Sequence, residues 1–193
     1  VIATALGTLA ALGLSRPHMP YKGLIMAILI SPMIVPLIIT AAGMFFFYAR
    51  INLVYTFTGV ILAHVALATP FVVITVTATL VGFDMNMVKA AQSLGAKPMR
   101  TFFKVIMPLI LPGIISGALF AFITSFDEVV IVMFMASIDQ LTIPKQMWAG
   151  IRQEISPVIL CMATCLVLLS IFLLTTVEVL RRRSEKLRGI KAR

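Results

Sequence analysis

The sequence predicts an all-α fold, a polytopic transmembrane helical bundle, and two observations predict it. The chain is 61% hydrophobic and 12% charged, with a mean hydropathy of +1.09, whereas soluble domains are about 45–50% apolar and about 25% charged. Several uncharged runs also reach the roughly 20 residues that a helix needs to cross a hydrocarbon core about 30 Å thick. We therefore expect one transmembrane domain over residues 1–193.

The apolar runs divide the chain into membrane segments. Residues 1–14 are uncharged but too short to span a bilayer, and they contain no basic region of the kind that begins a secretory signal. Because the chain also opens on Val1, we expect this segment to be the end of a helix truncated at its N-terminus. Four complete spans are predicted, at residues 23–49, 52–82, 107–136 and 155–180.

Lys and Arg predict the orientation of these spans, because cytoplasmic loops are enriched in both residues. The short connection at residues 15–22, a polar loop at residues 84–106 and a basic tail at residues 181–193 together hold all but three of the 16 basic residues. We expect these three segments, and with them the C-terminus, on the cytoplasmic side. The net charge of +9 then lies at membrane edges facing anionic lipid, and no nucleic-acid partner is expected.

The loop at residues 84–106 contains two short amphipathic helical patterns. Gly95 lies between them, where a chain reversal needs a residue that tolerates positive φ, and Pro98 suits the first turn of the second helix. We expect Pro108 to stand at the start of the next span. Such a hairpin could rest on lipid headgroups or dock on a partner protein. The apolar positions are Met87, Ala91 and Leu94 in the first pattern and Met99, Phe102, Phe103 and Ile106 in the second.

The stretch KAAQSLGAKPMRTFFKVIMP resembles the EAA loop of binding-protein-dependent ABC transporter permeases. Ala90, Ala91, Gly95 and Pro108 match that pattern in register, whereas Lys89 stands where the family usually has Glu. The resemblance implies the ABC importer permease fold, and it implies that the loop is a coupling helix seated in a groove on an ATPase. The implied partners are two ABC ATPase subunits, a second permease subunit and a periplasmic solute-binding protein. The implied location is the bacterial inner (plasma) membrane.

Asp127 and Glu128 are the most costly residues in the predicted span 107–136, because an acid at mid-bilayer is disfavoured by about 2.5–3.5 kcal/mol. They could face outside water, pair with Arg152 or Lys145, or attract a cationic solute along the transport path. The surrounding SFDEVVIVMF resembles the corresponding segment of spermidine/putrescine permeases. That resemblance implies a polyamine solute, with ferric ion or thiamine as alternatives.

The remaining polar and proline residues within the spans predict no chemistry. His64 is isolated among apolar residues and is interpreted as packed or hydrogen-bonded, while Pro32 and Pro36 are one turn apart and suit a bend. No G-x-x-x-x-G-K-[ST] phosphate loop is present. We therefore expect a transporter subunit with no catalytic residue, cofactor or metal site, and ATP hydrolysis by a separate subunit. The rival interpretation is a secondary transporter or a membrane scaffold.

Overall fold

The computed structural model describes residues 1–16, 19–81, 85–153 and 157–187. Over these residues the chain is all-helical, as the hydropathy predicts, and the described part contains no β-strand. The described elements, in chain order, are α1 (Ile2–Leu14), α2 (Lys22–Ile34), α3 (Leu37–Arg50), α4 (Phe57–Val81), α5 (Met85–Ser93), α6 (Pro98–Thr101), the π-helical turn η1 (Phe102–Ile106), α7 (Met107–Phe126), α8 (Val130–Met135), α9 (Ile143–Gln153) and α10 (Pro157–Leu187).

Among the described residues, three helices are long and apolar enough to cross a membrane, and α2 with α3 qualifies as a fourth, bent span. The first is α4, which begins five residues after the start of the predicted span 52–82 and extends to Val81, the last described residue of that span. The second is the continuous helix Pro98–Phe126, which joins α6, η1 and α7. The third is the segment Pro157–Thr176 of α10, on which the predicted span 155–180 falls. The tail predicted at residues 181–193 starts within α10, which continues to Leu187.

The segment predicted as one span at residues 23–49 is instead a broken pair of helices. α2 and α3 meet at an angle of 107°. The local cause is Pro36, whose ring disfavours helical backbone in the preceding residue, and Val35 is accordingly extended, with φ −70° and ψ 136°. Pro32 remains inside α2. The bend suggested by the two prolines therefore occurs, but at Pro36 alone.

The segment predicted as a span at residues 107–136 is also divided differently. Its long helix begins earlier, at Pro98, and ends at Phe126, and the short helix α8 follows after a break at residues 127–129. The two acidic residues therefore lie in a break between helices and not within one helix.

The core of the bundle is formed by α1, α4 and α7, which pack closely because glycines face α4. Gly7 on α1 and Gly117 on α7 both lie against Val72. A Cβ added to Gly7 would lie 2.6 Å from the Cβ of Val72, and a Cβ added to Gly117 would lie 2.9 Å from its Cα. Val72 and Val76 are fully buried between the three helices. Small residues at such positions let helix backbones approach in lipid, where van der Waals packing drives association.

A second buried cluster joins α3, α4 and α8. Met135 of α8 is fully buried there, and its carbonyl accepts the backbone N–H of Tyr55 at 2.9 Å. That bond ties the turn before α4 to the end of α8. The buried members of the cluster are Ala41, Ala63, Leu67, Ile131 and Met135.

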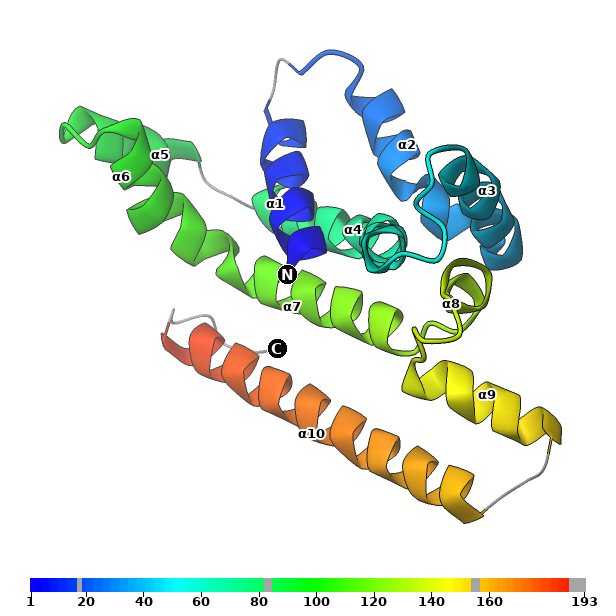
Figure 1. The fold of residues 1–193 in the computed structure, drawn as a ribbon. Coiled ribbons are helices and arrows are strands. Elements are labelled where there is room, and N and C mark those ends of the chain that lie inside the picture. Colours follow the sequence, from blue (N-terminus) through cyan, green and yellow to red (C-terminus); the bar gives the residue numbers. More distant parts are fainter. Residues whose placement is uncertain (17–18, 82–84, 154–156, 188–193) are drawn as a thin grey trace.

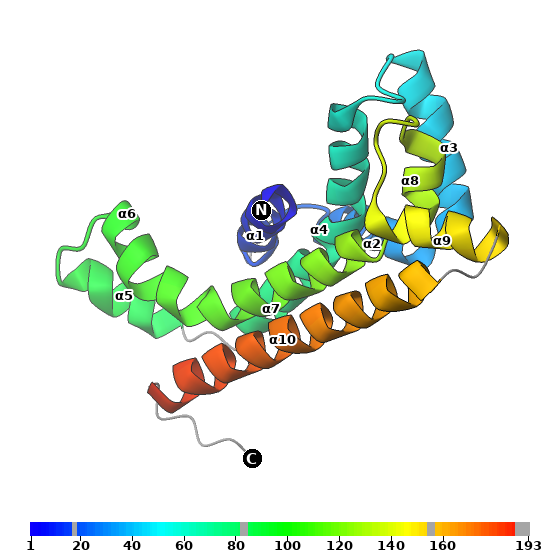
Figure 2. The same cartoon turned by 60° about the horizontal axis from the view of Figure 1, so that its bottom comes forward.

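The arrangement places the two candidate functional regions at opposite ends of α7 (Figure 1). α5 and α6 lie at one end, and α8 and α9 lie at the other. α10 runs alongside α7 in both views (Figures 1 and 2). No residue in the hydrophobic window of α10 is buried inside the chain, so this helix presents its apolar surface outward.

Candidate functional site

The loop at residues 85–106, here called the hairpin, consists of α5, a turn at Gly95, α6 and η1. Gly95 has φ +78°, as its position between the two helical patterns predicts. The Ala96 N–H donates to the Ala91 carbonyl at 3.0 Å, and the Gly95 N–H donates to the Gln92 carbonyl at 2.9 Å. These two bonds form the Schellman motif, which ends a helix with a left-handed residue. Gly95 therefore terminates α5 and reverses the chain.

The fully buried side chains of the hairpin lie outside the two amphipathic patterns. Val88 and Thr101 are buried, while Ala91 is half-buried and Ala90 is exposed. Met87, Leu94, Met99 and Phe103, which belong to the two amphipathic patterns, are exposed, and Leu94 keeps 88% of its surface. The hairpin thus offers apolar side chains outward. Of the two alanines, Ala91 therefore lies on the side that packs against the chain, and Ala90 lies on the exposed side.

Basic side chains accompany these exposed apolar residues. Lys89, Lys97, Arg100 and Lys104 are all exposed. Residues 85–106 contain no Asp or Glu, and the one acid of the predicted loop 84–106, Asp84, lies outside the described residues. An anionic surface, whether protein or lipid, would be attracted to the hairpin.

η1 joins the hairpin to α7, and Pro108 explains why this turn is π-helical. In an α-helix the ring of Pro108 would clash with the carbonyl four residues earlier, that of Lys104. The wider π turn relieves this clash, and the Met107 N–H donates to the Phe102 carbonyl five residues back. Pro108 was expected to begin the next span. Instead it lies in the second position of α7, inside a helix that already started at Pro98.

The two acidic residues after α7 have different surroundings. Glu128 is 6% exposed, and its Oε1 accepts the backbone N–H of Ile131 at 2.8 Å in the first turn of α8. Asp127 is exposed and lines a groove of about 330 Å³ between α7, α9 and α10. Lys145, a predicted partner of the acids, donates from Nζ to the Ala136 carbonyl at 3.4 Å. Glu128 is therefore a helix-capping group, and Asp127 is the acid that faces a groove.

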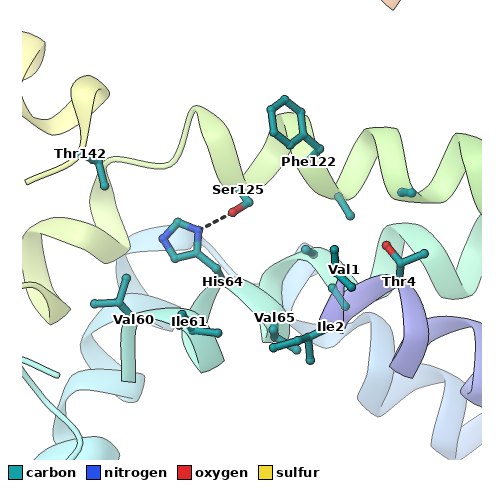
Figure 3. A pocket seen from close by; sticks show the side chains of 14 residues that line it. Val1, Ile2, Thr4, Val60, Ile61, His64, Val65, Phe122, Ser125 and Thr142 are labelled. Atoms are coloured by element: carbon teal, nitrogen blue, oxygen red, sulfur yellow. Dashed lines mark hydrogen bonds between the residues drawn. The ribbon is translucent and has the colours of Figure 1, made fainter. Parts of the chain in front are cut away.

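A cavity of about 500 Å³ lies between α1, α4 and α7, on the side of the bundle toward α8 and α9. His64 of α4 and Ser125 of α7 point toward each other at its edge (Figure 3), with Nδ1 and Oγ 2.8 Å apart. The interpretation of His64 as a hydrogen-bonded residue is thus confirmed. Most of the remaining wall is apolar, including Val65 and Phe122. Asp127 and Glu128 do not line this cavity.

The cap at Glu128 and the partner of His64 were missed by sequence reasoning. The sequence carries no standard signal for the first, because Glu128 lies one residue before the N-cap Val129, and Glu is not among the residues preferred for capping. No local signal exists for the second, since 61 residues separate His64 from Ser125.

The chain is similar in sequence to known permease proteins. The chain is 30% identical over 184 residues to the spermidine/putrescine transport system permease protein PotC of Haemophilus influenzae. The matched region covers 95% of this chain and 72% of that protein. The chain is 37% identical over 103 residues to the putrescine transport system permease protein PotI of Escherichia coli, covering 53% and 37%, respectively. A PotC homolog of Mycoplasma genitalium is 26% identical over 198 residues, covering 99% and 69%.

A family model also matches most of the chain. It describes the binding-protein-dependent transport system inner membrane component, and it matches residues 3–186. This range includes all of the described helices except the first residue of α1 and the last residue of α10. The protein therefore belongs to the family of inner membrane components of binding-protein-dependent transport systems.

Proposed function

We propose that this chain is a permease subunit of an ATP-driven ABC importer, and that it carries a polyamine such as spermidine or putrescine across the bacterial inner membrane. The observation that carries the proposal is the continuous helix Pro98–Phe126. One end of this helix forms the second arm of the hairpin, and the other end reaches the break at Asp127. A movement of the hairpin would therefore act directly on a membrane span.

Two features support the hairpin as the contact with one of the two ATPase subunits. Its turn is fixed by a Schellman motif at Gly95, and its outer surface combines exposed apolar side chains with the small residue Ala90. Small residues allow a partner to approach the backbone closely. In this proposal the hairpin and the C-terminal residues face the cytoplasm. A second permease subunit completes the membrane part, and a periplasmic solute-binding protein docks at the end that carries α8 and α9.

Two observations favour a polyamine as the solute. The relatives described above are named as spermidine/putrescine and putrescine permeases. Asp127 also offers a carboxylate to a groove whose wall includes Phe122 and Phe126, with ring centroids 5.3 Å apart. A carboxylate beside aromatic rings suits an ammonium group, which is attracted to both. The methylene chain of a polyamine would lie against the apolar remainder of the groove.

The test is uptake of radiolabelled putrescine into proteoliposomes that contain the full complex of permeases and ATPases, with the solute-binding protein added. We expect uptake that requires ATP, stops with an ATPase inactivated in its phosphate loop, and is displaced by unlabelled spermidine. Uptake that persists without ATP and collapses with the proton gradient would establish a secondary transporter instead. ATP hydrolysis stimulated by ferric ion or thiamine, and not by putrescine, would assign another solute.

A further inference from the structure

The outward face of α5 combines a cation with small residues. Helical residues are about 100° apart, so Asn86, Ala90 and Ser93 lie on the side opposite the buried Val88, and Lys89 lies at the edge of that side. These four residues are exposed. Leu94 follows at the end of the helix, 88% exposed. A partner that approaches this face meets a flat strip at Ala90 and Ser93, with Lys89 beside it and a leucine at its end.

The charge of this surface is uniform in sign. The hairpin carries Lys89, Lys97, Arg100 and Lys104 with no acid in residues 85–106. Lys89 alone among them is on α5, next to Ala90. A cation beside a close protein contact loses part of its hydration when the partner docks, and a carboxylate within reach compensates for that loss.

We propose that the ATPase groove which receives this hairpin presents an Asp or Glu side chain to Lys89 and an apolar pocket to Leu94. The inference rests on the proposed function, because it assigns the chemistry of the partner surface at that same contact. A lipid surface is the less favoured occupant. Lipid could neutralise the cations and accept Leu94 at the acyl boundary, but it gains little from the short exposed side chains of Ala90 and Ser93, which suit the close approach of a protein backbone.

A water-soluble carbodiimide tests the pairing in the purified importer complex. The reagent joins a Lys amine to an adjacent carboxylate as an amide, and takes up the oxygen and hydrogens of the lost water to become a urea. We expect mass spectrometry to find a peptide in which Lys89 is joined to an Asp or Glu of the ATPase. Lys89→Arg keeps the charge and abolishes this product, because a guanidinium is not joined under these conditions.

Affinity supplies the second measurement. We expect Lys89→Met to weaken binding of the isolated ATPase to the permease pair roughly five- to tenfold at low salt, with the difference shrinking at high salt. The matched control is Lys145→Met on α9, which lies at the end of α7 opposite the hairpin. We expect it to keep the wild-type affinity. Leu94→Ser weakens binding at both salt concentrations, because its contribution is apolar.

The outcomes separate this inference from the proposed function. If the ATPase binds the wild-type permease but Lys89 forms no product and Lys89→Met binds as tightly as wild type, the inference is wrong and the proposed function stands. If Lys89→Met instead loses binding to phosphatidylglycerol vesicles and not to the ATPase, the cation contacts lipid, and the inference is again wrong. If no ATPase binds the wild-type permease pair, the proposed function itself fails.

Discussion

Glu128 and Ile131 are joined by a hydrogen bond of 2.8 Å, from the Ile131 backbone N–H to the Glu128 carboxylate, in the buried turn where α8 begins. The bond gives a partner to an N–H that has no acceptor within the helix. α8 in turn packs on α3 and α4. Glu128 therefore contributes to the position of α8, and its role is distinct from that of its neighbour Asp127.

We predict that Glu128→Ala destabilises the protein by about 1 kcal/mol, the typical effect of removing a helix cap. Glu128→Gln keeps a carbonyl acceptor for the Ile131 N–H and is expected to lose less. Thermal unfolding of the detergent-solubilised importer measures both. Equal stability of Glu128→Ala and wild type would contradict the capping role.

Asp127 is predicted to affect transport rather than stability. It is exposed in the groove between α7, α9 and α10. Asp127→Asn therefore preserves the shape of the groove and removes the negative charge of the Asp127 side chain. We expect a raised half-saturating concentration for putrescine uptake, by roughly five- to tenfold for one lost ion pair, with an unchanged unfolding temperature. Uptake and affinity equal to wild type would remove Asp127 from the solute path.

Gly95 is predicted to be sensitive to substitution because of its backbone and not because of crowding. Its φ is +78°, and a Cβ built on it would meet nothing within 4 Å. We expect Gly95→Val to cost about 1–2 kcal/mol in left-handed backbone strain, to distort the hairpin and to uncouple ATP hydrolysis from uptake. Gly95→Asn, which tolerates this conformation better, is the control and retains more coupling. The ratio of ATP hydrolysed to putrescine transported is the quantity to measure.

Gly117 is predicted to be sensitive for the opposite reason. A Cβ there would overlap Thr75 Oγ1 and lie 2.9 Å from the Cα of Val72, so α4 and α7 must separate to admit it. We expect Gly117→Ala to lower stability by about 1–3 kcal/mol. Gly43→Ala on α3, where a Cβ meets nothing within 4 Å, is the matched control. If Gly43→Ala lowered stability as much as Gly117→Ala, the loss would come from the Gly→Ala change within a helix and not from crowding between α4 and α7.

The hydrogen bond between His64 and Ser125 connects α4 to α7 at 2.8 Å. We predict that His64→Ala and Ser125→Ala each cost about 1 kcal/mol, and that the double variant costs no more than the larger single change. Stability measured for all four proteins gives the coupling energy directly. Simple additivity would mean that the two side chains do not interact in the membrane.

The features that sequence reasoning predicted best depend on residues close together in the chain. Hydropathy gave the helical class because each span is a local run of apolar residues, and Gly95 was identified as the turn because a Schellman motif involves only the residues around it. A bend near Pro32 and Pro36 was predicted, since the effect of a proline on the preceding residue is local. Its size of 107° depends on the packing of α2 and α3 and was not predictable.

The features that were missed depend on the break after Phe126 and on contacts between distant segments. Asp127 and Glu128 were interpreted as members of one helix, in which adjacent side chains point about 100° apart. The break gives them separate surroundings, one in a groove and one in a helix cap. The exposure of Met87 and Leu94 is compatible with the amphipathic spacing, which predicts that apolar residues share a face but not what covers that face.

The helix Pro98–Phe126 has a mechanical consequence. Its 29 residues make a rod about 43 Å long at 1.5 Å per residue, with the hairpin at one end and Asp127 directly after the other. A rod transmits displacement by stiffness, so the two ends need no relay of side-chain contacts between them. The rod's hydrogen bonding changes at η1, and π turns are among the places where long helices bend. In the proposed mechanism, the stiffness of that turn would set how much of a displacement of the hairpin reaches the far end.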